Sequence, residues 1–424
     1  MPLAILLLAL GVRCGTVYYW QSKAEVEQRA FRLGDSHSYW ILAGHIARGE
    51  SYEYGSSDSK IFRAPLYPIF LAPFTLINDE SLGIWVARLA GSLMGTAAVW
   101  IVFLLGWRMG GYAAGCWAGV LAAVYPGAIG MSIVILSEVI FCPLMLLNIL
   151  AWQSAFASKS NSSLLRWASV AGVAAGLGIL ARPSWLLFAP ALAALGLLFG
   201  PRRSKHLVVF LVSLATCSLA MSPWWIRNAI ITGRFVPTTL QVGPSLYDGL
   251  HAGATGASDE GMSFSVEHAN KLAEEDRLGN LGPESEIADG DVFEYRLNQR
   301  MTRLALEWSL ENPTSVLWLA GVKLTRVWSL WPDGKEVGST GLRLALTGAC
   351  LGVLILALWA SRRLATQHGW LAMVCWMPTF YFTVLHIIFV GSIRYREPAI
   401  LVATVLAGCA IASILHSRRE IHGS

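Results

Sequence analysis

Charged residues are scarce in this sequence. Asp, Glu, Lys and Arg make up only 14% of the 424 residues, and 55% of the residues are hydrophobic, whereas about 25% charge is usual in soluble domains. The hydrophobic residues form runs that are long enough to cross a bilayer. A single water-soluble globule is therefore excluded, and we expect an all-α polytopic membrane protein.

Several chemical signatures are also missing. The seven cysteines lie within hydrophobic runs and have no paired spacing, so they indicate neither disulfides nor zinc ligands. The histidines lack metal-ligand spacing, and a metal site would need carboxylates and His251 brought together by folding. A Gly-rich phosphate loop, a Walker motif and a Gly-x-Ser-x-Gly elbow are absent, so nucleotide hydrolysis and serine-esterase chemistry lack support. No basic tail suggests nucleic acid as a partner.

About ten segments have the length and hydropathy of transmembrane helices. They are residues 2–19, 83–106, 112–126, 128–155, 162–181, 183–200, 206–226, 340–360, 369–390 and 397–416. The first has no basic leader and no small-residue cleavage site, so we interpret it as an uncleaved helix rather than a signal peptide.

The two signs of charge are segregated along the chain. Basic residues gather in short loops: Arg108, Lys159, Arg166, Arg202, Arg203, Lys205, Arg362, Arg363, Arg418 and Arg419. Asp and Glu lie in residues 20–82 and 227–339, with three exceptions: Glu138, Glu397 and Glu420. By the positive-inside rule the basic loops are cytoplasmic and the two acidic segments are outside. Residues 65–77 must then lie at the outer interface, because a full crossing would reverse every later loop.

The outer segments carry local helix signals. Residues 35–48 read as an amphipathic helix on the membrane surface, with Tyr39, Ala43 and Ile46 on one face. Residues 293–330 look helical, whereas residues 250–290 are rich in Gly, Ser, Asp and Glu, and we expect them to be irregular and partly mobile.

A carboxylate and an arginine stand in the first outer segment. Asp35 lies in Gly34-Asp35-Ser36-His37, and Arg63 lies in Phe62-Arg63-Ala64-Pro65. Transfer of a sugar from a phospholipid needs a base for the acceptor hydroxyl and a cation for the departing phosphate, and these residue types fit. The alternative interpretation of Asp35 is a helix N-cap.

Glu138 is the only carboxylate within a hydrophobic run, in Leu136-Ser137-Glu138-Val139. Ionisable residues are costly there and point toward a partner or a cavity. An ion pair with an arginine such as Arg182 and a role in substrate or metal binding both explain it.

Four arginines stand at the expected outer ends of spans, against the usual charge bias: Arg182, Arg227, Arg394 and Arg396. A bound lipid phosphate explains them, because guanidinium groups grip phosphate oxygens in a planar fork. Anchors that reach for the membrane surface beside Trp are the alternative for some of them.

The order of these motifs along the chain resembles the GT-C glycosyltransferase superfamily. The motifs are Asp35, Arg63-Ala64-Pro65-Leu66-Tyr67-Pro68, Ser137-Glu138, Gly178-Ile179-Leu180-Ala181-Arg182-Pro183, Pro223-Trp224-Trp225-Ile226-Arg227-Asn228 and Arg394-Tyr395-Arg396. The pattern is similar to the branch of bacterial protein mannosyltransferase-like and aminoarabinose transferase-like enzymes, from the first helix to the last.

The resemblance implies a catalytic seven-helix module in residues 1–226, with an amphipathic first outer loop and a long outer loop, 227–339, after helix 7, followed by C-terminal helices in residues 340–424. It also implies a polyprenyl-phosphate sugar donor and inversion at the anomeric carbon. Asp35 then matches the presumed base and Glu138 the second acidic position, so we expect both to be catalytic, and Arg63 matches a basic position before the proline.

We therefore expect an inverting hexosyl- or pentosyltransferase of the cell membrane, with its active site facing the periplasm or exterior. Its partners are membrane lipids, a polyprenyl-phosphate sugar and an acceptor glycan, lipid or protein. No cofactor is certain. A divalent metal stays open, but Lys60-Ile61-Phe62-Arg63 lacks the acidic neighbour that some relatives carry beside the basic residue, which argues against a metal at this position. The alternative function is a transporter or flippase of lipid-linked sugars, which predicts inverted repeats, whereas the two halves are dissimilar.

Overall fold

The computed structural model describes residues 1–27, 30–31, 34–55, 59–259, 263–277, 292–332 and 339–422, and within them it contains helices and no strands. Among these described residues, eight helical stretches are long and apolar enough to cross a membrane, with α4 counted once. They are α1 (Pro2–Val26), α4 (Glu80–Val124), α6 (Glu138–Ala157), α7 (Asn161–Ala181), α9 (Arg203–Thr232), two segments of α14 (Thr340–Ile388), and α15 (Glu397–His422). The predicted all-α polytopic fold is confirmed.

Helix α4 is two membrane segments joined by a sharp turn. Gly110 and Gly111 leave the helical conformation, and Gly111 has φ +81°, which glycine adopts without steric cost. The two parts correspond to the expected spans 83–106 and 112–126. A further expected span, 183–200, contains the short turn η1 (Pro183–Trp185) and α8 (Phe188–Phe199).

One expected span is wrong. Residues 128–155 do not form a single helix, because α5 (Pro126–Ile133) ends before a break at residues 134–137 and α6 begins at Glu138. Hydropathy did not reveal the break, since Val134, Ile135 and Leu136 are as apolar as the helices on either side. Glu138 consequently lies at a helix N-terminus, where the helix dipole favours a carboxylate.

The outer segments form short helices. Helix α2 (Gly34–Arg48) and α3 (Leu66–Thr75) agree with the expected surface helix and the expected interfacial piece, since ten residues of helix span only about 15 Å. The long outer segment contains α10 (Val242–Gly249), α11 (Ser263–Arg277), α12 (Phe293–Glu311) and α13 (Pro313–Val327). Helix α11 lies where we expected irregular chain, and residues 278–291 are outside the described part.

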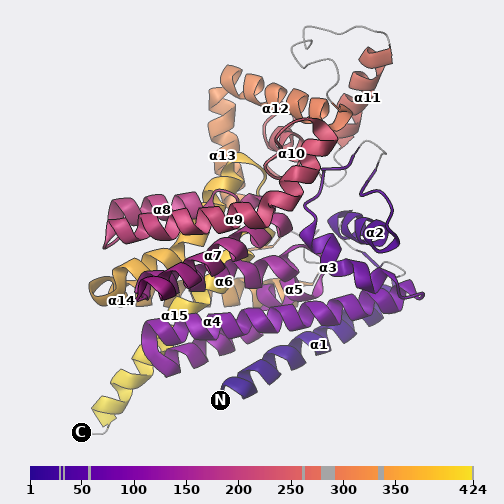
Figure 1. Ribbon diagram of the computed structural model, residues 1–424. Helices are drawn as coiled ribbons and strands as arrows, with labels where there is room; N and C mark the ends of the chain where they lie inside the picture. Colours follow the sequence, from indigo (N-terminus) through magenta and orange to yellow (C-terminus); the bar gives the residue numbers. More distant parts are fainter. Residues whose placement is uncertain are drawn as a thin grey trace.

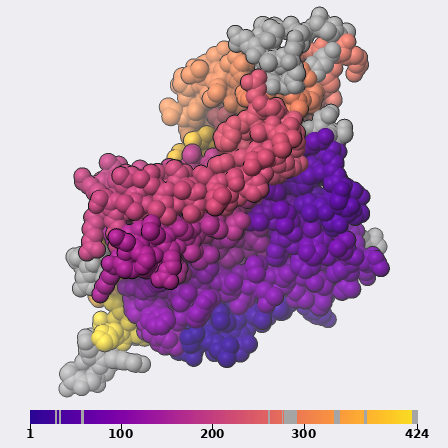
Figure 2. All heavy atoms as spheres, in the orientation of Figure 1, coloured from indigo at the N-terminus to yellow at the C-terminus, as the bar shows by residue number. Residues whose placement is uncertain are grey.

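The outer helices α10 to α13 build a lobe on the helical bundle (Figure 1), and the space-filling view shows it rising above the membrane helices (Figure 2). The N-terminus and the end of α15 lie toward the same end of the bundle (Figure 1). Two residues of the basic segments make contacts at the cytoplasmic end of the expected topology: Lys205 donates to the carbonyl of Ser158 at 2.6 Å, and Arg363 donates to the hydroxyl of Ser413 in α15.

Small residues let the membrane helices approach closely. A Cβ added at Gly408 of α15 would lie 2.4 Å from the backbone nitrogen of Ala118 in α4, and one at Gly172 of α7 would lie 2.2 Å from the carbonyl oxygen of Ser213 in α9. Neither contact leaves room for a side chain. Close backbone packing of this kind is typical of helices in membranes, where burial of apolar surface does not drive association.

Candidate active site

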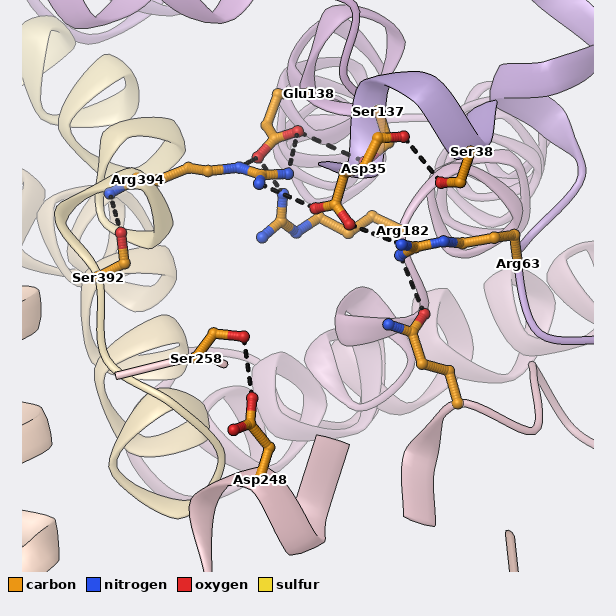
Figure 3. A network of polar contacts seen from close by, with 11 residues as sticks. Asp35, Ser38, Arg63, Ser137, Glu138, Arg182, Asp248, Ser258, Ser392 and Arg394 are labelled. Carbon is orange, nitrogen blue, oxygen red and sulfur yellow. Dashed lines mark hydrogen bonds and ion pairs between the residues drawn. The ribbon is translucent and has the colours of Figure 1, made fainter. Parts of the chain in front are cut away.

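Asp35, in the first turn of α2, lies between two arginines that come from distant parts of the chain (Figure 3). Its Oδ1 is 2.6 Å from Nη2 of Arg63, and its Oδ2 is 3.1 Å from Nη1 of Arg394. The two guanidinium groups hold the pKa of the Asp35 carboxyl well below its usual value, against the opposing effect of burial. About a third of the Asp35 side chain is still exposed, so a small molecule can reach it.

Glu138 has no exposed side-chain surface, and two arginines face it as well. Nη1 of Arg182 lies 2.5 Å from Oε1, and Arg394 contacts Oε1 through Nε at 2.6 Å and Oε2 through Nη2 at 3.2 Å. A carboxylate with no exposed surface would strongly destabilise the fold if no cation were paired with it. The ion pair with Arg182 is the structural alternative that the sequence suggested, and Arg394 adds a second partner.

Arg394 joins the two carboxylates, since its guanidinium contacts both Asp35 and Glu138. We call the set of Asp35, Glu138, Arg63, Arg182 and Arg394 the array. Two carboxylates face three guanidinium groups in this array, which leaves an excess of one positive charge. The array lies where α6 begins, where α7 ends and just before α15, at the outer end of the expected topology. A concentrated positive charge beside a partly exposed carboxylate is suited to binding an anion such as a phosphate.

The side chain of Arg63 is held by the long outer segment and by α2. Nη1 of Arg63 donates to Oε1 of Gln241 at 3.2 Å, and its guanidinium lies over the ring of Tyr39. The other arginine-bearing loop is held in the same way: the amide of Gly391 donates to the carbonyl of Gly256 at 2.8 Å, and Lys323 donates to the carbonyl of Ile388 at 2.7 Å. The outer lobe therefore supports both sides of the array.

Two of the predicted phosphate-binding arginines lie outside the array. Arg227 donates to the carbonyl of Lys60 at 3.2 Å and stacks on Tyr52 and Trp224. Its contacts show that it supports the loop of Arg63.

Arg396 is 1% exposed and donates to the carbonyls of Val327 and Ser329 at 3.1 and 2.7 Å. It also pairs with Glu397 at 3.4 Å, so its guanidinium is used to hold the end of α13. A phosphate contact by Arg396 therefore has no geometric support.

Two residues beside the array were not identified from the sequence. Tyr395 stacks on His386 with ring centroids 3.8 Å apart, and the guanidinium of Arg182 lies 5.4 Å from the Tyr395 ring centre. Tyr395 lies within the Arg-Tyr-Arg motif, which was the available signal. His386, isolated in a hydrophobic run, gave a weaker one.

The carboxylates of the array do not fit a divalent cation. Oδ1 and Oδ2 of Asp35 and both oxygens of Glu138 already face guanidinium nitrogens at 2.5–3.2 Å. Across the described residues, no group of three or more His, Cys, Asp or Glu side chains is arranged to hold a metal. The positive charge at this site comes from arginine.

Comparisons with known proteins agree with this architecture. Residues 63–226 match the family model described as dolichyl-phosphate-mannose-protein mannosyltransferase. No curated protein sequence matches the chain.

Among solved structures, the archaeal oligosaccharyltransferase AglB from Archaeoglobus fulgidus, in complex with an inhibitory peptide and a dolichol-phosphate, is similar over 100% of this chain and 51% of its own, with 13% identity and a TM-score of 0.62. The apo form of the Archaeoglobus fulgidus enzyme is similar over 100% of this chain and 52% of its own, with 16% identity and a TM-score of 0.60. ArnT from Cupriavidus metallidurans, bound to undecaprenyl phosphate, has 13% identity, a TM-score of 0.41, and coverage of 91% of this chain and 74% of its own.

This chain spans about half the length of the archaeal oligosaccharyltransferase. At these identities the likeness concerns the fold, and the family match covers the part of the chain that carries Arg63, Glu138, Arg182 and most of α9. The chain therefore shares the fold of the archaeal oligosaccharyltransferase, and residues 63–226 resemble the mannosyltransferase family, in agreement with the predicted GT-C resemblance.

Proposed function

We propose that this protein is an inverting glycosyltransferase that moves a sugar from a polyprenyl-phosphate donor to an acceptor hydroxyl on the outer face of the membrane. The observation that carries the proposal is the array around Asp35, in which a partly exposed carboxylate and an excess of positive charge meet. A structure with the same fold, AglB, was solved with a dolichol-phosphate. A lipid-linked phosphate is the anion that a membrane site of this charge would take.

Donor binding changes the basicity of Asp35, because the donor phosphate and Asp35 bind the same two arginines. In the structure Arg63 and Arg394 are bound to Asp35, and a carboxylate with such a low pKa is a weak base. When the donor phosphate binds, its oxygens compete for the same guanidinium groups. Asp35 then loses the charges that lower its pKa, so its pKa rises and it can accept a proton.

The transfer step follows from this arrangement. The acceptor oxygen attacks the anomeric carbon of the sugar from the side opposite the phosphate, and its proton passes to Asp35. The bond between the anomeric carbon and the phosphate oxygen breaks, and its electron pair stays on the phosphate, which Arg63 and Arg394 stabilise. Attack from the opposite side inverts the anomeric configuration.

Glu138 acts through the arginines. It is fully buried and contacts Arg182 and Arg394, so it holds both guanidinium groups in place. In this proposal Asp35 is the catalytic residue and Glu138 is a positioning residue. The third arginine, Arg182, contributes to the positive charge that receives the leaving phosphate.

The outer lobe faces the array from the side on which an acceptor would enter, and Figure 3 shows Asp248 and Ser258 of this lobe opposite Asp35. We assign acceptor selection to residues 227–339 and catalysis to residues 1–226 together with Arg394. The acceptor is a glycan, a lipid or a protein, and the sugar is a hexose or a pentose.

The direct test uses the purified protein in liposomes with labelled polyprenyl-phosphate sugars and a panel of hydroxyl acceptors. Transfer of label with inverted anomeric configuration, read by nuclear magnetic resonance of the product, is the expected result. Transport of the intact lipid-linked sugar across the bilayer without transfer would contradict the proposal and favour the flippase alternative.

A further inference from the structure

Glu294, on α12 of the outer lobe, contacts the loop that carries Arg63. Its Oε2 accepts hydrogen bonds from the backbone amides of Lys60 at 2.8 Å and Ile61 at 2.9 Å, and Oε1 lies 3.3 Å from the Ile61 amide. The residue is only 7% exposed. These contacts join positions more than 230 residues apart, since Lys60 and Glu294 are separated by 234.

The carbonyl groups of the same two residues are held by other segments. Arg227 of α9 donates to the carbonyl of Lys60 at 3.2 Å, and the amide of Leu240 donates to the carbonyl of Ile61 at 3.1 Å. Glu294 accepts the hydrogen bonds of both backbone amides of this dipeptide, whereas Arg227 and Leu240 bind its two carbonyl groups. Arg63, two residues further along, contacts Asp35.

We propose that Glu294 is a positioning residue that holds the loop of Arg63 from the outer lobe, so that the lobe controls where the Arg63 guanidinium meets Asp35 and the donor phosphate. This inference rests on the proposed glycosyl transfer. Without Glu294 the two amides lose their acceptor, and the loop has no reason to keep the conformation that directs Arg63 toward Asp35.

A carboxylate is an unusual choice for a purely structural contact. Burying a charged group costs free energy that a neutral acceptor would avoid. Arg227 faces Glu294 from α9, and Ser59 of the loop donates a hydrogen bond to it. Burial nevertheless outweighs these partners and raises the pKa of Glu294 to about 7.

The contact is consequently sensitive to pH near neutrality. Ionised Glu294 accepts from both amides, whereas the protonated form has a hydroxyl that cannot accept equally well from them. Because the pKa is raised from its ordinary value of 4.5 to about 7, Glu294 is half protonated at about pH 7 and becomes fully protonated as pH falls further. The free-enzyme pKa of Asp35 is too low to produce a change in this range.

The test compares Glu294→Gln, Glu294→Asp and Glu294→Ala in the full-length protein in liposomes. The matched control is Glu307→Gln, since Glu307 lies on the same helix, is 57% exposed and pairs only loosely with Arg303 at 3.7 Å. The kinetic readout is the pH profile of kcat/KM for the donor, which reports ionisations of the free enzyme.

We expect wild-type kcat/KM to fall below about pH 7 and Glu307→Gln to behave in the same way. Glu294→Gln should lower kcat/KM by about 10- to 100-fold above pH 7 and remove the acidic limb, because the amide resembles the protonated acid. Glu294→Asp should keep an acidic limb with lower activity. An acidic limb near pH 7 that persists in Glu294→Gln would overturn the inference.

A second measurement does not depend on activity. Hydrogen exchange followed by mass spectrometry should show faster exchange of the Lys60 and Ile61 amides in Glu294→Ala and unchanged exchange in Glu307→Gln. Unchanged exchange of these two amides in Glu294→Ala would overturn the inference that Glu294 holds the loop. If the wild-type protein transfers no sugar, the proposed function fails by itself, whereas an active wild type with an unaltered Glu294→Gln profile rejects only this inference.

Discussion

The Nε atom of Arg394 lies 2.6 Å from Oε1 of Glu138, so the arginine that precedes α15 is ion-paired with the carboxylate that begins α6, 256 residues earlier. Glu138 has no exposed side-chain surface, and three quarters of the Arg394 side chain is covered. Solvent cannot compensate either charge fully when the other is removed.

Glu138→Gln should therefore destabilise the protein by about 3–5 kcal/mol, the usual effect of breaking a buried pair. The measurement is the thermal midpoint in detergent, and adding Arg182→Gln to the same protein should recover part of the loss because it removes one uncompensated charge. Glu50→Gln, in an exposed pair with Arg48, is the control and should leave the midpoint in place. A Glu138→Gln midpoint equal to that of the wild type would contradict the role given to this pair.

Arg63→Ala should weaken donor binding as well as turnover, because a phosphate contact operates in both the ground state and the transition state. We expect kcat/KM for the donor to fall by about 10- to 100-fold. Arg63→Lys should recover only part of this, since an ammonium group lacks the planar fork. Arg48→Ala is the control, because Arg48 is 52% exposed and pairs with Glu50. Unchanged donor affinity in Arg63→Ala would remove Arg63 from the phosphate site.

The sequence predicted the membrane helices well because hydropathy reports them directly. It did not predict the break before Glu138, since residues 134–137 are apolar except for Ser137 and the average over a window hides a turn. It suggested Arg182 as a partner of Glu138 because both stood in otherwise apolar surroundings.

The link from Glu294 to the amides of Lys60 and Ile61 had no sequence signal. An acceptor for backbone amides in an irregular loop can come from any polar residue, and α12 lies far away along the chain. Gln241, which contacts Arg63, was missed for the same reason. The sequence could identify charged residues as site candidates where they stand in apolar runs. It could not single out Glu294 or Gln241, because polar residues are common in the polar segments around them.

Removal of divalent metals should leave sugar transfer unchanged. The oxygens of Asp35 and Glu138 already face guanidinium groups, so arginine supplies the positive charge that a metal would otherwise bring to the leaving phosphate. The measurement is the transfer rate after dialysis against a chelator, with and without added Mg²⁺ or Mn²⁺. Loss of activity that either ion restores would contradict this arrangement.

The topology prediction concerns the two faces of the membrane. A cysteine at Glu267 on α11 should react with a membrane-impermeant thiol reagent from outside intact cells, and a cysteine at Lys159 should react only after permeabilisation. Both positions are exposed in the structure. The expectation rests on the segregation of basic loops from acidic segments. Labelling of position 267 only after permeabilisation would reverse the orientation and place the array on the cytoplasmic side.

The most direct test of the account is sugar transfer by Asp35→Asn, with donor binding followed separately. Asparagine keeps the size of the side chain and can still accept a hydrogen bond, but it cannot act as a base. We predict a loss of about 10²–10⁴-fold in transfer rate, with donor binding retained and a thermal midpoint close to that of the wild type. Transfer by Asp35→Asn at the wild-type rate would contradict the central claim and leave Asp35 as a partner of Arg63 and Arg394 without a catalytic role.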